Sequence, residues 1–80
     1  MNKTVIEILG WYGAAAILLA FALSSFGVLS PASLIYQILN LTGALSIFAD
    51  TMTKKDYQPA TLNIVWAMIA LVSLLRTFFV

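Results

Sequence analysis

The sequence lacks cysteine and histidine altogether, and only seven of its 80 residues are charged, four basic and three acidic. The absence of cysteine excludes disulfides and thiol chemistry. The absence of histidine removes the most frequent metal ligand and general base. There is no zinc-protease motif, phosphate-binding loop or basic patch for nucleic acid. We therefore expect no enzyme, no metal or cofactor site, and no nucleic-acid partner.

Charge is missing most completely between Glu7 and Asp50, where 42 consecutive residues carry none. A soluble domain of this size would need charged side chains on each element, because most of its surface contacts water. A lipid bilayer suits this sequence better, with the few charges at its headgroups. We therefore predict an integral membrane protein, and we expect the lipid bilayer to be its partner.

The uncharged run is too long for a single crossing, since a helix needs only about 20 residues to cross the hydrocarbon core. A turn is expected at residues 27–33, where Gly27 can end one helix, Ser30 can cap the next and Pro31 can take its first position. Thr4 and Glu7 have the spacing of a capping box for the first helix. The prediction is an all-α, three-helix transmembrane bundle in a single domain, residues 1–80, with helices at about 4–27, 31–49 and 58–79.

The four basic residues divide unevenly between the two sides that three crossings create. Three of them fall on the N-terminal side and one on the other: Lys3, Lys54 and Lys55 against Arg76. The excess of basic residues in cytoplasmic segments therefore predicts a cytoplasmic N-terminus and a periplasmic or extracellular C-terminus. We expect Asp50 to end the second helix and to pair with a neighbouring lysine.

A cleaved signal peptide is the alternative interpretation of the first segment, since Ala20-Phe21-Ala22 resembles a cleavage site. Two features argue against it. Glu7 interrupts the basic region that a signal peptide needs, and the apolar run continues through Leu29 without a polar stretch. A membrane helix is the better interpretation.

Small residues recur at steps of three and four along the first helix and share one face: Gly13, Ala16, Ala20, Ser24 and Gly27. Small side chains let helix backbones approach closely, and this packing drives helix association in lipid. We predict that this face is a helix-packing seam. The alternative is a stripe that lines a pathway for a solute.

Uncharged polar and aromatic residues on the second and third helices are the candidates for a site: Tyr36, Gln37, Asn40, Asn63, Trp66 and Ser73, with Thr77 on the same face as the last. An amide that faces lipid without a partner is costly, so these side chains should point into the bundle or across a subunit boundary. They can act as interhelical hydrogen bonds or line a polar solute site. Counting residues along the helices predicts that Asn40 and Trp66 lie at different depths, with Asn40 closer to Ala70 and Ser73.

Three segments carry a resemblance to a known family: Trp11-Tyr12-Gly13, Tyr36-Gln37-x-x-Asn40-x-x-Gly43-Ala44 and Leu62-Asn63-x-x-Trp66. Together they resemble a family of small, uncharacterised bacterial inner-membrane proteins, the Coxiella-type conserved hypothetical domain, whose members are sometimes labelled permease or transporter. The resemblance covers almost the whole chain and implies a location in the bacterial inner membrane. It implies no established activity.

A second likeness is to the bacterial half-transporters of the SWEET class, in chain length, helix number and an Asn/Trp pair. The sequence lacks their Pro-Gln pair in the first helix, so this likeness concerns architecture alone.

Two functions are compatible with the sequence. The first is an oligomeric transporter-like or channel-like protein for a small neutral or polar solute. The alternative is a non-catalytic membrane scaffold or accessory subunit, which would pack against partner helices through the small-residue face of the first helix. Three short helices bury little of one another's surface. Both functions therefore predict a homo-oligomer, a dimer or larger. The scaffold function also allows membership of a larger membrane complex.

Overall fold

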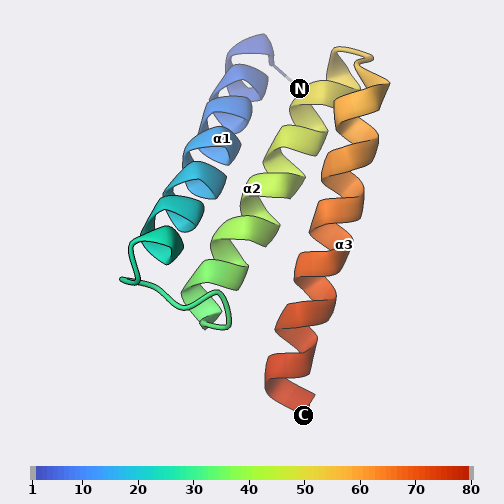
Figure 1. Cartoon of the computed structure of the whole chain (residues 1–80). Helices are drawn as coiled ribbons and strands as arrows, with labels where there is room; N and C mark the ends of the chain where they lie inside the picture. The colour runs from blue at the N-terminus through green and yellow to red at the C-terminus, as the bar shows by residue number, and fades with distance from the viewer. Residues whose placement is uncertain (1, 80) are drawn as a thin grey trace.

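The structure is a computed structural model that describes residues 2–79 as three helices: α1 (Lys3–Ser25), α2 (Leu34–Thr53) and α3 (Tyr57–Phe79). The described residues contain no strand, so the all-helical prediction is confirmed. Figure 1 shows the helices side by side, with α2 in the middle and running opposite to its neighbours. α2 packs against α1 and α3, whereas no contact joins α1 to α3 within residues 2–79. α2 is therefore the central helix, against which both other helices pack.

The first turn differs from its prediction in where α2 begins. Ser33, not Ser30, caps this helix, and its hydroxyl accepts a hydrogen bond from the Tyr36 amide at 3.2 Å. The Ser30 hydroxyl instead accepts from the Ala32 amide at 3.1 Å, so Ser30 and Pro31 belong to the preceding turn. The prediction of a helix from residue 31 was three residues too early because two nearby serines can both act as caps.

Asn2 caps the start of α1, in place of the predicted capping box at Thr4. Its side-chain oxygen accepts from the Thr4 amide at 2.6 Å. At the other end α1 stops at Ser25, and Gly27 follows with a φ of +75°. Val28 donates its amide to the Leu23 carbonyl at 2.9 Å, which completes a glycine-containing helix end. Gly27 therefore ends the helix as predicted, but lies outside it.

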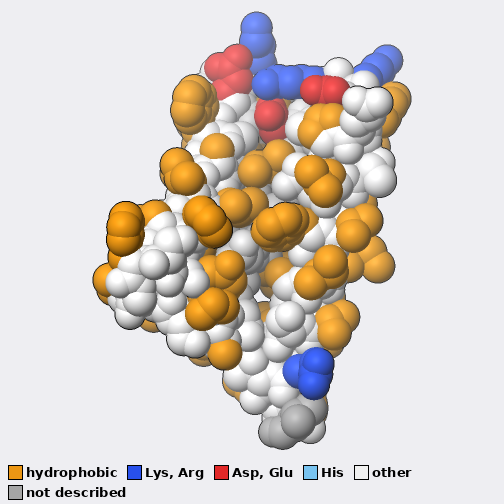
Figure 2. Space-filling view, in the orientation of Figure 1, with side chains coloured by type: hydrophobic (Ala, Val, Ile, Leu, Met, Phe, Trp, Pro, Cys, Tyr) orange, Lys and Arg blue, Asp and Glu red, His pale blue; other side chains and the backbone are white. Residues whose placement is uncertain are grey.

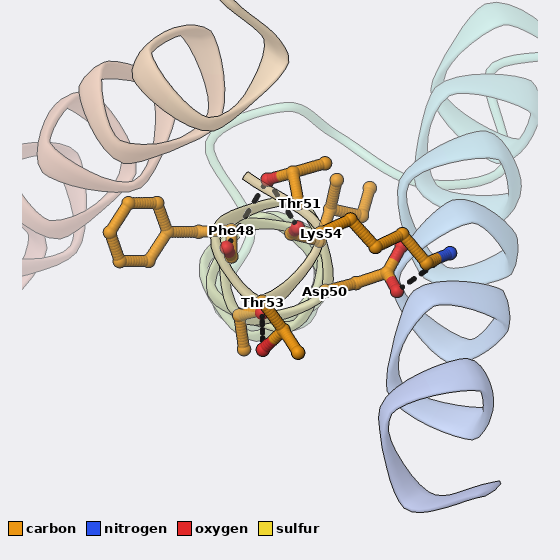
Figure 3. A network of polar contacts seen from close by, with 7 residues as sticks. Phe48, Asp50, Thr51, Thr53 and Lys54 are labelled. Carbon is orange, nitrogen blue, oxygen red and sulfur yellow. Dashed lines mark hydrogen bonds and ion pairs between the residues drawn. The ribbon is translucent and has the colours of Figure 1, made fainter. Parts of the chain in front are cut away.

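α2 continues past the predicted end at residue 49 to Thr53. The hydroxyls of Thr51 and Thr53 donate to the carbonyls of Ile47 and Ala49, each at 2.8 Å, as part of the contacts drawn in Figure 3. These bonds satisfy the hydroxyls inside the helix, so a polar run does not have to end it. Asp50 consequently lies a turn inside α2, where its carboxylate is 3.1 Å from Lys54 Nζ, and the predicted pairing with a lysine is confirmed.

The helices pack through small side chains. Among residues 2–79, every buried apolar side chain but one belongs to an alanine, and the exception is Ile6. α1 and α2 approach each other closely at Gly13 and Gly43, because a Cβ on Gly13 would lie 2.5 Å from the Gly43 carbonyl oxygen. Helices without large core side chains are held by backbone proximity, which is the pattern of helix pairs in lipid.

Large apolar side chains cover the outside of the bundle, and two of the helices, α1 and α3, are long and apolar enough to cross a membrane. α2 does not meet the same test, because Gln37, Asn40 and Asp50 lower its mean hydropathy. Figure 2 shows acidic and basic side chains gathered at one end and a single basic side chain near the other.

Candidate functional site

The middle of the α2–α3 contact contains a hydrogen bond between two predicted site residues. Trp66 donates its indole N–H to Oδ1 of Asn40 at 3.2 Å. Asn40, which is buried, donates its amide to the carbonyl of Tyr36 one turn earlier, at 2.9 Å. Counted from the α2–α3 turn, Asn40 and Trp66 are offset by about one helical turn, as expected from the sequence. The long indole side chain spans this offset, so the two side chains meet although their backbones lie at different levels.

A second polar bridge lies further along the same contact, at Gln37. Oε1 of this buried amide accepts the Thr77 hydroxyl at 3.0 Å, and Nε2 donates to the Ala32 carbonyl at 3.4 Å. Thr77 also donates to the Ser73 carbonyl at 3.1 Å, so its hydroxyl proton is shared between two acceptors. Gln37 thereby connects α2 both to α3 and to the turn that precedes α2.

A pocket of about 340 Å³ is lined by residues of both bridges, and Trp66 in its wall is 46% exposed. Its lining combines amides, hydroxyls, aromatic rings and small apolar groups: Pro31, Tyr36, Gln37, Asn40, Trp66, Ile69, Ala70 and Ser73. Five of the six predicted site residues thus surround one space. This pocket is the α2–α3 groove.

Asn63 is the predicted site residue that does not line the groove. Its side chain is half-buried, and the amide donates to the Pro59 carbonyl at 2.8 Å, within the first turns of α3. Asn63 lies about one turn closer to the α2–α3 turn than Trp66. Its role in the structure is local to α3.

The predicted packing seam of α1 divides into two parts. Gly13, Ala16 and Ala20 are buried, and Gly13 and Ala16 lie directly against Gly43 of α2. Ser24 is only half-buried, and Gly27 is exposed beyond the end of α1. The buried part is therefore occupied by this chain's own α2 and is not free for a partner protein.

Two features of the structure were not predicted from the sequence. Pro31 and Ile69 line the groove although neither has a polar group, and only the tertiary packing brings them there. Tyr12 and Thr42 share a hydrogen bond at 2.8 Å between α1 and α2. The Thr42 hydroxyl also contacts its own helix at the Ile38 carbonyl, so the bond to Tyr12 gives α1 a polar anchor beside the glycine contact.

The groove presents uncharged hydrogen-bonding groups. Each amide nitrogen carries two N–H groups, and residues 2–79 provide an acceptor for one on Asn40 and one on Gln37. The remaining donors, the second lone pair of Asn40 Oδ1 and the Ser73 hydroxyl suit an uncharged polar solute. No ionisable side chain other than Tyr36 lines this space, and no cluster of metal-ligating side chains occurs in the described part of the chain.

Comparison with protein families gives a match over residues 6–79, to the uncharacterised Coxiella-named family that the sequence resembles. Neither the curated proteins nor the solved structures contain a match. The arrangement of the groove is therefore the basis on which a function can be argued.

Proposed function

Because the chain belongs to this Coxiella-named family of uncharacterised proteins, matched over residues 6–79, we propose its function from its geometry: an oligomeric membrane protein that passes a small neutral or polar solute through the α2–α3 groove. The single observation that carries the proposal is the convergence of Asn40, Gln37, Trp66 and Ser73 on one space between α2 and the apolar helix α3. Neutral amides and hydroxyls in such a place recognise hydrogen-bonding solutes without requiring charge.

The exposure of the apolar helices supports a place in the bilayer. Only 22% of the apolar stretch of α1 and 11% of that of α3 are buried inside the bundle. An apolar helix in the core of a soluble protein would be largely buried, whereas here the apolar side chains point outward. Lipid is the solvent that such a surface suits, and a bacterial inner membrane is the location we propose.

The direction of the helices supports three crossings. α1 and α3 run the same way in Figure 1, so if both cross the bilayer, α2 must return through it. Its polar residues then do not disqualify it, because α1 and α3 cover Asn40, Gln37 and Gly43. The excess of basic residues at the charged end supports a cytoplasmic N-terminus, with Arg76 on the periplasmic side.

A groove that opens outward at mid-membrane would face acyl chains, which offer no hydrogen bonds to Ser73 or to the remaining amide protons. A second copy of the chain across the opening would enclose the space and exclude lipid from it. Copies inserted in the same direction are related by an axis along the membrane normal, so their grooves meet at the same depth. We therefore propose a homo-oligomer in which the grooves line the path.

The proposal is tested by solute flux in proteoliposomes, measured as light scattering after mixing with glycerol, urea or a small sugar alcohol. Asn40→Leu removes the central amide of the groove and should abolish flux. Asn63→Leu makes the same change of amide to leucine outside the groove and should retain it. Wild-type flux in the Asn40→Leu protein, or equal loss in both variants, would contradict the proposed path.

A scaffold or accessory role is the second candidate, and one observation favours it. Asn40 and Gln37 already make hydrogen bonds to Trp66 and Thr77, so they can act as interhelical bonds without any solute. In that case the partner would have to use an outer face of the bundle, because α2 occupies the buried part of the α1 seam. Absence of flux together with co-purification of one defined membrane protein would favour this role.

A further inference from the structure

A second pocket lies at the charged end of the bundle, between α1 and the last turns of α2. It has a volume of about 470 Å³ and combines two carboxylates, one ammonium group and one indole: Glu7, Gly10, Trp11, Ala14, Asp50 and Lys54. It shares no residue with the α2–α3 groove, which lies on the other side of α2. The acidic and basic side chains at one end of Figure 2 mark the end at which this pocket is found.

Asp50 is held against α1 at this pocket. A Cβ placed on Gly10 would lie 2.8 Å from Oδ2 of Asp50, so the carboxylate occupies room that a side chain at position 10 would take. The Asp50 side chain is only 15% exposed. Figure 3 shows Asp50 and Lys54 both extending from α2 toward α1. The carboxylate is thus fixed in the wall of the pocket and does not extend freely into solvent.

The hydrogen-bonding capacity of the Asp50 carboxylate is only partly used. Lys54 Nζ lies 3.1 Å from Oδ1, but this buried oxygen accepts no aligned hydrogen bond from residues 2–79. A carboxylate can accept about four hydrogen bonds. Asp50 also lies within about a turn of the C-terminus of α2, where the helix dipole favours a cation over an anion. The surroundings of Asp50 therefore favour a second positively charged hydrogen-bond donor next to its carboxylate.

The other walls of the pocket favour the same kind of group. Glu7 adds a second carboxylate, so the lining carries two negative charges against the single ammonium of Lys54. Trp11 is 79% exposed and presents an indole, whose face attracts cations. At the cytoplasmic boundary of the bilayer, a positive group next to a phosphate is offered by phospholipid headgroups that contain an amine.

We propose that this pocket binds the headgroup of an aminophospholipid. Its primary ammonium donates hydrogen bonds to Glu7 and Asp50, and its phosphate lies beside Lys54. Trp11 lies next to the ammonium at the headgroup level, a place that indoles favour. The inference rests on the membrane location proposed above, but it does not depend on solute passage through the α2–α3 groove.

The first test compares headgroups. Purified protein in detergent is titrated with short-chain phosphatidylethanolamine, phosphatidylcholine and phosphatidylglycerol, and the midpoint of thermal unfolding is followed by circular dichroism. Phosphatidylethanolamine should raise the midpoint at the lowest concentration. The other two should bind about tenfold more weakly, because one has no N–H donor and the other has no ammonium. An equal response to all three lipids, or none to any, would overturn the proposal.

The second test uses variants at the charged end. Glu7→Gln keeps the shape of an exposed side chain and should weaken phosphatidylethanolamine binding about tenfold. Asp56→Asn removes a carboxylate from the same end that does not line the pocket and should have no effect. If both substitutions weaken phosphatidylethanolamine binding equally, the effect comes from overall charge, and the proposed site is overturned. Trp11→Ala, at a side chain that supports no packing, should also weaken binding, and it decides the matter if Glu7→Gln does not fold.

A lipid headgroup and a soluble amine can carry the same ammonium and phosphate groups, and the soluble compound phosphoethanolamine distinguishes between them. It should bind far more weakly than the lipid, since it lacks the acyl chains that keep the headgroup at the membrane surface. Binding as tight as that of the lipid would show that the ligand is a soluble amine and would overturn the lipid assignment. Glu7→Gln proteoliposomes should still pass solute, so failure of the headgroup site is distinguishable from failure of the groove.

Discussion

Trp66 donates its indole N–H to Oδ1 of Asn40, and this bond between α3 and α2 lies at the edge of a pocket that both residues line. Asn40 is buried, while Trp66 remains almost half exposed. The same contact can therefore stabilise the helix pair and orient the amide for a solute. These two roles make different predictions for stability and flux.

The Asn40–Trp66 hydrogen bond should contribute about 1 kcal/mol to the free energy of unfolding, the usual range for interhelical bonds in lipid. Trp66→Phe keeps an aromatic ring but removes the donor, and Asn40→Leu removes the acceptor. A double-mutant cycle measured by unfolding in mixed micelles gives the coupling between them. Additive effects of the two substitutions would mean that the bond adds no stability.

Gly13→Ala should destabilise the bundle by about 2 kcal/mol or more, because its Cβ would lie 2.5 Å from the Gly43 carbonyl oxygen and backbone cannot move aside easily. Gly10→Ala meets the flexible Asp50 side chain at 2.8 Å and should destabilise less. Ala15→Leu, on the exposed side of α1, is the control and should be near neutral. Unfolding in mixed micelles measures all three, and a Gly13→Ala protein as stable as wild type would contradict the close glycine contact.

Lys55→Gly should stabilise the protein by about 0.5–1 kcal/mol, because Lys55 has a φ of 58° in the turn after α2, a conformation that strains residues other than glycine. The amides of Lys55 and Asp56 donate to the carbonyls of Met52 and Thr51, so the turn itself is well bonded. Lys55→Ala removes the charge but keeps the strain and should give no such gain. A rise of equal size in both variants would assign the effect to charge.

Cysteine labelling should find Lys3→Cys and Lys55→Cys on one side of the membrane and Arg76→Cys on the other. The natural chain has no cysteine, so each variant carries a single thiol. In spheroplasts treated with a membrane-impermeant maleimide, only the Arg76→Cys protein should be labelled before lysis. Labelling of all three variants, or of none, before lysis would refute the three-crossing topology with a cytoplasmic N-terminus.

Much of the architecture follows from local sequence. The uncharged run with a Gly-Ser-Pro interruption predicts two helices joined by a turn, and Asp50 with Lys54 predicts the ion pair that the structure contains. Helix ends were less predictable, since Ser30 and Ser33 both have the chemistry of a cap and the local sequence does not choose between them. Ser33 caps the helix because the Ser30 hydroxyl accepts from the Ala32 amide.

The candidate site was predictable as a set of residues and not as an arrangement. Polar residues in apolar helices are few, so Tyr36, Gln37, Asn40, Trp66 and Ser73 could be identified from their chemistry. Counting along the helices nevertheless separated Asn40 from Trp66, and the polar chemistry of Asn63 alone included it among the candidates. Counting residues gives the depth of a backbone position but not the length of an indole side chain. It also does not show that the Asn63 amide donates a hydrogen bond to the Pro59 carbonyl of its own helix.

By itself the sequence determined that the chain forms three helices with charge concentrated at one end, because periodicity, caps and charge are local properties of the polymer. Only the tertiary structure decided that α2 lies between the other two helices and that α1 and α3 do not touch. It also decided that Gly13 meets Gly43 and that the polar residues enclose one groove. Those outcomes depend on how closely particular helix faces approach, which is set by contacts between residues about 30 positions apart.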